Sequence, residues 1–374
     1  MAHLADALRR AHSSLILSNP NPRVGCIIAS ASGQVLGEGH TQKAGSPHAE
    51  VMALGDARDR GHSVVGATAY VTLEPCSHHG RTGPCCDALI AAGIKKVVAT
   101  IADPNPLVAG NGFARLRAAG IEVEVLEASD PLALESREIN IGFFSRMVRK
   151  TPWVRMKVAA SLDGKTALSN GVSQWITSPD ARADGHGWRA RACAVLTGIG
   201  TVLQDDPRLD VRLVHTPRQP HVVIVDSNLE TPLNAQILLP GRKIFLYYAV
   251  DSAQRRLALE NAGATAIYLP GKDANGKLTG KVDLQAMLKD LAAREINELH
   301  VEAGHRLNGS FLREGLVDEL LVYLAPKLIG QGADMANLGP LTQLGEARQL
   351  EFKSTTTVGA DLRILARVAG RDHF

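Results

Sequence analysis

The chain has 374 residues, of which 45% are hydrophobic and 21% charged, and a formal net charge of +3. These values are typical of a globular protein, and the length predicts two domains, with three as the alternative. The low charge and an aromatic content of 4% argue against a nucleic-acid-binding surface. No stretch approaches the ~20 apolar residues of a membrane span. We therefore expect neither nucleic acid nor a membrane as a partner.

The five cysteines are an odd number in a long chain, which argues against a disulfide framework. Free thiols fit a reducing compartment, so we expect a cytoplasmic protein. The sequence leaves the oligomeric state open, a homo-oligomer included.

The first half of the chain alternates between helix and strand patterns. The predicted strands cover residues 24–29, 35–39, 67–73, 96–102 and 121–126. The predicted helices cover residues 1–18, a segment from 47, 84–92, 113–119 and 130–148. Ser46 is expected as the N-cap and Pro47 as the first residue of the second of these helices. This alternation predicts a three-layer α/β/α domain, which binds ligands at the carboxyl ends of its strands.

The second half begins after a basic segment, residues 146–152, that ends in Thr-Pro. We place the domain boundary there, which divides the chain into residues 1–148 and 149–374. The second half again alternates, which predicts another α/β domain. Its predicted strands are 154–158, 193–196, 221–225, 243–248, 266–269, 299–302 and 319–324, and its clearest helices are 181–190 and 283–293.

One nitrogen and two sulfur ligands in the first half predict a zinc site. His48, Cys76 and Cys85 would supply three ligands and leave the fourth position for a water. Zinc lowers the pKa of such a water toward neutrality, which makes it a nucleophile. Glu50 lies two residues after His48 and is expected to move the proton rather than bind the metal.

The spacing only partly matches the zinc nucleobase deaminases, which carry H-x-E and P-C-x-x-C. His48 and Glu50 fit the first motif, whereas eight residues separate Cys76 from Cys85. A structural zinc knuckle is the alternative, but it would normally show four closely paired ligands. The acidic residue beside His48 and the proline before Cys76 favour catalysis.

The long insertion resembles a specific family. Residues 72–85 read TLEPCSHHGRTGPC, residues 103–106 read DPNP and residues 109–112 read AGNG. These segments are similar to the bifunctional deaminase–reductases of riboflavin biosynthesis, and the resemblance covers nearly the whole chain. It implies a cytidine-deaminase-like α/β/α domain followed by a dihydrofolate-reductase-like α/β domain.

The resemblance also implies two reactions. The first is zinc-dependent hydrolytic deamination of 2,5-diamino-6-(5-phosphoribosylamino)pyrimidin-4(3H)-one, a small phosphoribosyl pyrimidine. The second is NADPH-dependent reduction of the ribosyl side chain, which gives 5-amino-6-(5-phosphoribitylamino)uracil. In the deaminase half, Asn21, His78 and Arg81 are the candidate substrate contacts, against the alternatives of a plain turn and a solvated loop.

Two glycine-containing turns in the second half, residues 197–201 and 304–309, each lie between a strand and a helix. Such turns present free N–H groups to phosphate, although either alone could be an ordinary connection. The segments SLDG (161–164), SQWIT (173–177), GTVL (200–203) and DDP (205–207) carry the resemblance to the reductase half.

That resemblance implies contacts with both ligands of the reductase. The implied NADPH contacts are Ala159, Trp175, Thr201, Asp205, Ser227, Gly304, His305, Arg306, Leu307, Asn308 and Gly309. The implied substrate contacts are Ser173, Arg189, Leu209, Arg212 and Glu302. Arg189 and Arg212 would suit a phosphate because guanidinium groups bind it through two N–H groups. Core packing is the alternative for Trp175, and a helix cap is the alternative for Asp205.

Two other functions remain compatible with the residues alone. One is a nucleic-acid deaminase fused to an unrelated α/β domain, which the low charge and few aromatic residues disfavour. The other is a binding protein that zinc merely stabilises, which would have no use for Glu50.

Overall fold

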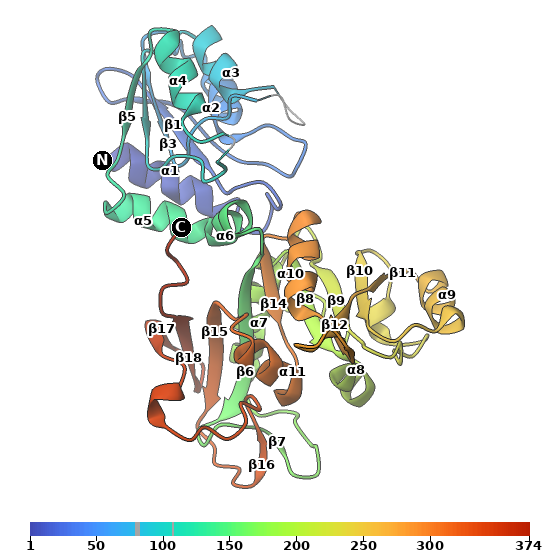
Figure 1. Cartoon of the computed structure of the whole chain (residues 1–374). Helices are drawn as coiled ribbons and strands as arrows, with labels where there is room; N and C mark the ends of the chain where they lie inside the picture. Colours follow the sequence, from blue (N-terminus) through green and yellow to red (C-terminus); the bar gives the residue numbers. More distant parts are fainter. Residues whose placement is uncertain (79–82, 107) are drawn as a thin grey trace. The chain divides into compact units, whose positions relative to one another are not determined.

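The computed structural model describes residues 1–78, 83–106 and 108–374 and separates into two compact units. The first unit contains Met1–Lys150 and the last residue, Phe374, and the second contains Thr151–His373 (Figure 1). The chain therefore passes between units after Lys150, close to the boundary expected after residue 148. No helix among the described residues is long and apolar enough to cross a membrane.

The first unit is a five-stranded sheet between helices. Its strands are β1 (Gly25–Ala29), β2 (Val35–His40), β3 (Thr68–Val71), β4 (Lys96–Ala99) and β5 (Glu122–Val125). Its helices are α1 (Ala2–His12), α2 (Ala49–Asp59), α3 (Cys85–Ala91), α4 (Asn111–Ala118), α5 (Pro131–Ile139) and α6 (Ile141–Arg149).

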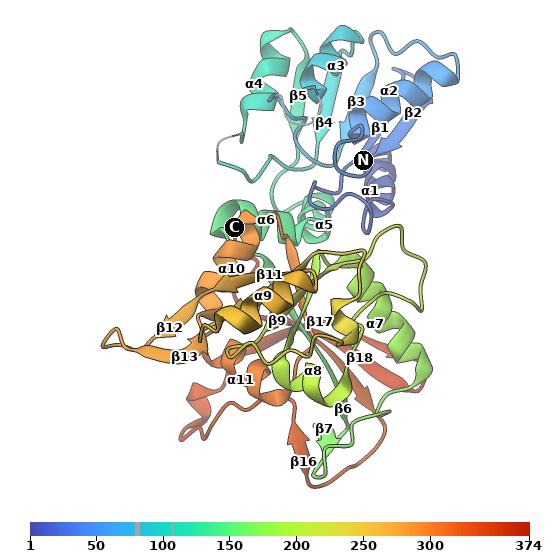
Figure 2. The same cartoon turned by 90° about the vertical axis from the view of Figure 1, so that its right-hand side faces the viewer.

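The strand order in this sheet is β2-β1-β3-β4-β5, and β1 is antiparallel to both of its neighbours. β3, β4 and β5 run parallel. Helices α1 and α5 lie on one face of the sheet, and α2 and α3 lie on the other (Figures 1 and 2). This is the predicted three-layer arrangement.

Helix α2 packs against the sheet at two glycines of β2. A Cβ on Gly37 would lie 2.2 Å from the Ala53 carbonyl oxygen, and one on Gly39 would lie 2.4 Å from the Ala49 oxygen. Ala49 and Ala53 are themselves fully buried. The helix backbone therefore lies as close to the strand as atoms allow, and β2 fixes the position of the turn that carries Glu50.

The start of α2 differs from the prediction. The helix begins at Ala49, and its N-cap is His48, whose backbone is extended (φ −80°, ψ 172°). Pro47 stays outside the helix, where its carbonyl accepts a hydrogen bond from the Gln42 N–H at 3.2 Å. Ser46 is therefore not the cap, and His48 projects from the helix end rather than from its first turn.

The helix predicted over residues 130–148 is two helices, α5 and α6, which meet at Asn140. The Asn140 side-chain oxygen accepts a hydrogen bond from the Arg23 N–H at 2.7 Å, and its amide donates to the Arg23 carbonyl at 3.0 Å. Asn140 is buried. The side chain thus satisfies the backbone of the segment before β1, a role that apolar periodicity does not reveal.

The second unit contains a nine-stranded sheet with the order β11-β10-β9-β8-β14-β6-β15-β18-β17. Its strands are β6 (Trp153–Ser161), β8 (Ala194–Gly198), β9 (His221–Val225), β10 (Ile244–Tyr248), β11 (Ala264–Tyr268), β14 (Glu298–Val301), β15 (Glu319–Ala325), β17 (Leu350–Val358) and β18 (Asp361–Val368). All neighbours are parallel except β18, which is antiparallel to β15 and β17.

Two small antiparallel pairs accompany this sheet. They are β7 (Lys165–Leu168) with β16 (Gly332–Asp334), and β12 (Pro270–Lys272) with β13 (Leu278–Val282). The helices are α7 (Pro179–Arg191), α8 (Ile199–Asp205), α9 (Ala253–Asn261), α10 (Leu284–Ala293) and α11 (His305–Arg313), with short 3-10 turns η1 (Gln236–Leu238) and η2 (Leu344–Glu346). The hairpin β17–β18 was not predicted.

A buried group of charges joins three central strands. Arg155 of β6 donates to Glu298 of β14 at 2.8 Å and to Glu319 of β15 at 2.6 Å. Glu319 also accepts from Arg367 of β18 at 2.8 Å. The Arg155 guanidinium lies 4.6 Å from the ring centre of Trp188 on α7. Each carboxylate meets a cation, as buried charges require, and the pairing ties these strands together.

We predict that Gly39→Ala destabilises the first unit by about 1–3 kcal/mol, because the added methyl overlaps the Ala49 carbonyl. The three tryptophans, Trp153, Trp175 and Trp188, all lie in the second unit. Denaturant unfolding followed by circular dichroism should therefore show an earlier transition, whereas tryptophan fluorescence should change little.

The matched control for this variant is Gly55→Ala, in helix α2, which packs against Gly39. An added Cβ there meets only the tip of the Arg58 side chain, at 4.0 Å. This variant should leave stability unchanged or raise it by roughly 0.5–1 kcal/mol, since alanine favours helix. Equal stability of the Gly39→Ala protein and the wild type would show that the close contact between α2 and β2 has no energetic importance.

Candidate functional site

Three predicted metal ligands meet in the first unit, although they come from separate segments. His48 ends the connection from β2 to α2, Cys76 follows β3, and Cys85 is the first residue of α3. Their ligand atoms all lie within 4.8 Å of one another, and they form the one such group of histidine, cysteine and acidic residues among the described residues. The site lies at the carboxyl ends of the strands, where α/β sheets bind ligands.

The spacing of these atoms suits zinc. His48 Nδ1 lies 3.7 Å from Cys76 Sγ and 3.4 Å from Cys85 Sγ. Tetrahedral zinc with bonds of about 2.0–2.3 Å would separate a nitrogen and a sulfur ligand by roughly 3.6 Å. One imidazole and two thiols are also the donor set of catalytic zinc sites that keep an open fourth position. The residues present therefore fit the ion.

A hydrogen bond between the two thiols shifts their pKa values in opposite directions. Hydrogen bonds from the Cys85 thiol and from His48 lower the pKa of Cys76 to about 4, although burial opposes this shift. The same hydrogen bond and burial raise the pKa of Cys85. The Cys85 backbone N–H, at the start of α3, also donates to Cys76 Sγ at 3.3 Å. The pKa of Cys76 is thus shifted toward the thiolate form that a metal ligand requires.

Glu50 is buried beside the ligands. Burial, and then the charge of Cys76, raise the pKa of its carboxyl to about 7. A carboxyl with this pKa can accept and release a proton near neutral pH, which a proton-transfer group must do.

The predicted substrate contacts of the deaminase half are not part of the group formed by the three predicted ligands. His78 is exposed and lies two residues after the predicted ligand Cys76. Asn21 lies in a turn, where its N–H donates to the Ser18 carbonyl at 2.8 Å. Arg81 lies outside the described residues. Cys86, the residue after Cys85, donates to the Pro75 carbonyl at 3.2 Å and is not part of the metal group.

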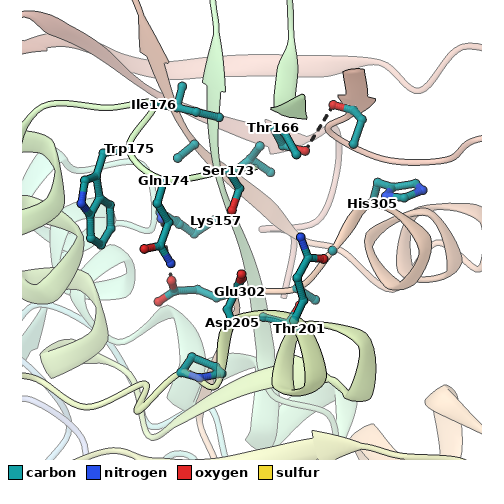
Figure 3. Close-up of a pocket in the computed structure, with 18 of the residues that line it drawn as sticks. Lys157, Thr166, Ser173, Gln174, Trp175, Ile176, Thr201, Asp205, Glu302 and His305 are labelled. Atoms are coloured by element: carbon teal, nitrogen blue, oxygen red, sulfur yellow. Dashed lines mark hydrogen bonds and ion pairs between the residues drawn. The ribbon is translucent and has the colours of Figure 1, made fainter. Parts of the chain in front are cut away.

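The second unit contains a cavity of about 940 Å³ at the carboxyl ends of β6, β8 and β14. Thr166, Ser173 and Ile176 lie along one side, Thr201 and Asp205 lie on the opposite side, and Trp175 and His305 lie at the two ends (Figure 3). The predicted contacts that line the cavity are Ala159, Ser173, Trp175, Arg189, Thr201, Asp205, Leu209, Arg212, Glu302, Gly304, His305 and Asn308.

Four predicted cofactor contacts are not among the described lining residues: Ser227, Arg306, Leu307 and Gly309. The reason for the last three is that residues 304–309 are not a loop, because α11 begins at His305 with Gly304 as its N-cap. In a helix, residues three apart share a face. His305 and Asn308 therefore face the cavity, whereas Arg306 is exposed.

A group of charges lies at the floor of this cavity. Arg189 forms a double ion pair with Glu302, one arm of which measures 2.8 Å, and also donates to the Asp210 carbonyl at 3.1 Å. Lys157 Nζ lies 3.7 Å from Glu302. Burial alone would raise the pKa of Glu302, but Arg189 and Lys157 hold it well below its usual value. Glu302 is therefore ionised.

Lys157 was missed in the sequence. It could have been found, because side chains alternate along a strand and Lys157 is two residues before the predicted contact Ala159 on β6. At the cavity mouth, Arg208 and Arg212 each pair with Asp210, at 2.8 and 2.6 Å. The cavity thus combines a cationic region with a polar wall, which suits anionic ligands.

Comparison with known proteins agrees with both sites. Residues 2–101 match the cytidine and deoxycytidylate deaminase zinc-binding region, and residues 152–364 match the RibD C-terminal domain. The riboflavin biosynthesis protein RibD of Escherichia coli is 43% identical, over 96% of this chain and 97% of that protein.

Two solved structures resemble the whole chain. Acinetobacter baumannii RibD is 38% identical with a TM-score of 0.88, over 98% of both chains. A Thermotoga maritima diaminohydroxyphosphoribosylaminopyrimidine deaminase/5-amino-6-(5-phosphoribosylamino)uracil reductase is 30% identical with a TM-score of 0.84, again over 98% of both.

The fold and the two sites define a zinc-dependent deaminase joined to a reductase in one chain. The similarity covers both halves of the chain and nearly the full length of the relatives, which identifies the family. The chain belongs to the RibD family of riboflavin biosynthesis proteins. The predicted fold and the two predicted activities are confirmed, and zinc and NADPH agree with them. The nucleic-acid deaminase and the non-enzymatic zinc protein are no longer tenable alternatives.

We predict that the chain binds one zinc ion and that Cys85→Ser lowers its zinc content severely. Cys86→Ser is the matched control, because its thiol bonds to the Pro75 carbonyl rather than facing the ligands. Metal analysis of the purified proteins should show near-wild-type zinc in this control. Similar losses from both variants would mean that the ligand set is wrong.

Proposed function

We propose that residues 1–148 remove the 2-amino group of 2,5-diamino-6-(5-phosphoribosylamino)pyrimidin-4(3H)-one by hydrolysis, and that residues 149–374 then reduce the ribosyl group to ribityl. The observation that carries the first half is the convergence of His48, Cys76 and Cys85 next to the buried acid Glu50. The cavity in the second unit, with its ionised Glu302 and neighbouring cations, supports the second half.

In the deaminase, the chain's own residues hold the metal and move protons. Zinc bound by His48, Cys76 and Cys85 would supply an activated water at neutral pH. Glu50 takes the proton that the attacking water loses and delivers it to the leaving amine, which departs as ammonia. Its burial and its pKa of about 7 suit both steps.

We assign substrate binding in this half to Asn21, His78 and Arg81. His78 and Arg81 belong to the insertion between two metal ligands, so they are tethered close to the reaction. An arginine there suits the 5′-phosphate because it can donate two parallel hydrogen bonds.

In the reductase, we assign NADPH to the wall formed by Ala159, Trp175, Thr201 and Asp205 and by the start of α11. NADPH supplies the hydride, and the protein aligns the donor and acceptor carbons. Ser227, Arg306, Leu307 and Gly309 remain proposed contacts that depend on how the cofactor extends beyond the cavity.

The substrate would occupy the part of the cavity lined by Ser173, Leu209 and the charged residues Arg189, Arg212 and Glu302. Arg189 is already paired with Glu302, so it holds that carboxylate in place in addition to contacting the substrate. Arg212 is paired only at the surface with Asp210, so it is the better-placed phosphate ligand. We add Lys157 to this group, since it lines the cavity beside Glu302.

We also propose a cytoplasmic location, supported by five free cysteines, two of which would bind zinc as thiolates. The oligomeric state stays open, and a homo-oligomer remains compatible with the sequence.

We predict that the two activities are separable. Glu50→Gln should keep zinc and fold but lower deamination by a factor of about 10² or more, the usual contribution of a general acid–base group. Reduction of the deaminated intermediate should stay nearly unchanged. Arg189→Ala should lower reduction by roughly tenfold to a hundredfold, because Glu302 and the ribosyl group lose their alignment, and it should spare deamination.

Each variant is assayed with each intermediate supplied separately, and products are read by mass spectrometry. The unaffected activity of each variant is its own control for folding. Loss of both half-reactions in folded Glu50→Gln protein would rule out two independent sites.

We predict that NADPH is preferred to NADH by at least about tenfold in kcat/KM, the effect of one charge-assisted contact to the 2′-phosphate. Arg306→Ala should lower this ratio, because Arg306 is a basic side chain in the first turn of α11 and is one of the proposed cofactor contacts. Steady-state kinetics with both nucleotides measures the ratio. Similar efficiency with NADH would refute the preference, and an unchanged ratio in Arg306→Ala would mean that another basic residue binds the 2′-phosphate.

A further inference from the structure

Glu74 is a buried acid two residues before the ligand Cys76, and neither proposed reaction uses it. One carboxylate oxygen accepts hydrogen bonds from the N–H groups of Asp103 and Gly110, at 3.1 and 2.9 Å. The other accepts from Gly112 and Phe113, at 2.8 and 3.3 Å. All four donors are backbone amides, so this single side chain organises a whole segment of another part of the chain.

Two of those amides belong to the first turn of α4. Its N-cap, Gly110, has a left-handed backbone (φ 80°) and no side chain to cap the helix. The first N–H groups of a helix need acceptors, and a carboxylate there also meets the positive end of the helix dipole. Glu74 therefore caps α4 from a distant segment, which stabilises both the helix and the approach to it.

The contact leaves no room for a Cβ at Gly112 unless the neighbouring backbone shifts. A Cβ at that position would lie 2.1 Å from the Pro75 carbonyl oxygen and 3.0 Å from a Glu74 carboxylate oxygen. Cys86 closes the same junction, since its thiol donates to the Pro75 carbonyl at 3.2 Å and lies 3.5 Å from the Gly112 carbonyl. Arg115 of α4 adds a further link, at 3.4 Å to the Ser77 carbonyl.

These contacts fix Asp103, the first residue of the segment, beside the metal site. Its carboxyl accepts from the Asn105 N–H at 2.8 Å, which holds the side chain in a tight turn. The same segment packs on both neighbours of Cys76, since a Cβ on Gly112 would lie 2.1 Å from the Pro75 carbonyl oxygen and Arg115 lies 3.4 Å from the Ser77 carbonyl. The segment that Glu74 holds is therefore a wall of the deaminase site.

We propose that Glu74 is a positioning residue for deamination, which holds residues 103–106 and 108–112 against the metal-binding segment and so shapes the surface that receives the pyrimidine. This rests on the proposed binding of the pyrimidine at the zinc site. Glu74 touches neither substrate nor metal in this role. It acts through the four amides, and its loss should weaken substrate binding more than it slows the chemical step.

The test is Glu74→Gln in the full-length, zinc-loaded protein. A glutamine has one acceptor oxygen, and its NH2 group would face two N–H donors, so two of the four amides lose their partner. We expect KM for the diaminopyrimidinone phosphate to rise about tenfold or more, the usual scale for unsatisfied buried groups. We expect kcat to change by less than KM, with zinc content and reductase activity unchanged.

Hydrogen exchange supplies a readout that does not depend on activity. In the wild type, the amides of Gly110 and Gly112 should be protected, and in Glu74→Gln peptides covering 103–113 should exchange faster. The matched control is Glu124→Gln, an exposed acid of β5 in the same unit that pairs with Lys96 at the surface. It should match the wild type in every measurement.

A second variant tests the same junction from the other side. Gly112→Ala should raise KM as Glu74→Gln does, and the double variant should show less than the product of the two effects, because both disrupt one contact. If Glu74→Gln does not fold, Gly112→Ala and exchange in the wild type still decide the matter.

Unchanged KM in folded Glu74→Gln, or unprotected Gly110 and Gly112 amides in the wild type, would overturn the proposal. So would loss of zinc with KM unchanged, since Glu74 would then support only Cys76. Failure of the wild type itself to deaminate this substrate would instead contradict the proposed function, and the exchange comparison would remain valid.

Discussion

The deaminase half depends on how closely α2 can approach its sheet. At Gly37 and Gly39 the strand has no side chains, and the helix opposite carries alanines, so backbone lies against backbone. This contact leaves no space for adjustment, and the helix end is fixed relative to the strand ends. His48 and Glu50 are on that helix end, whereas Cys76 and Cys85 come from the next connection in the sheet. A metal site assembled from segments 28 and 37 residues apart needs such a rigid frame, because its ligand atoms must agree within tenths of an ångström.

In the reductase half, one face of the sheet serves both stability and chemistry. Side chains alternate along a strand, so every second residue points toward α7. On this face lie Arg155, Lys157 and Ala159 of β6, Glu298 and His300 of β14, and Glu302, which directly follows β14. At the amino ends of the strands the charges are buried and paired with one another. Two to four residues further along the same face, Lys157, Ala159 and Glu302 line the cavity, where the charged side chains can contact ligands. The buried pairs thus set the register that places the cavity residues opposite each other.

Much of this could be predicted from the sequence, because local patterns carry it. The three proposed ligands, which the structure brings together, and Glu50 were predicted from residue type and spacing, and most central strands from their apolar character. What was missed depends on contacts between distant segments. His48 caps its helix because Pro47 is held by Gln42, and Asn140 breaks a helix because it bonds to Arg23. Most of the turn expected at residues 304–309 is the first part of α11. Gly309 does not interrupt this helix, because the helix face that contains it is buried. The hairpin β17–β18 has mostly exposed, polar residues on β17, so it gave no apolar pattern to detect.

The ion pair between Arg189 and Glu302 has a consequence for the energetics of ligand binding. A free arginine side chain samples many rotamers, and a ligand that binds it must offset the entropy lost when it is fixed. Here the carboxylate has already fixed the guanidinium before any ligand arrives, so that entropy has been lost during folding. The same pairing cancels most of the positive charge that an anion would otherwise meet. The cavity therefore recognises shape and hydrogen-bond direction at this position more than net charge, and a ligand that forces the pair apart is disfavoured.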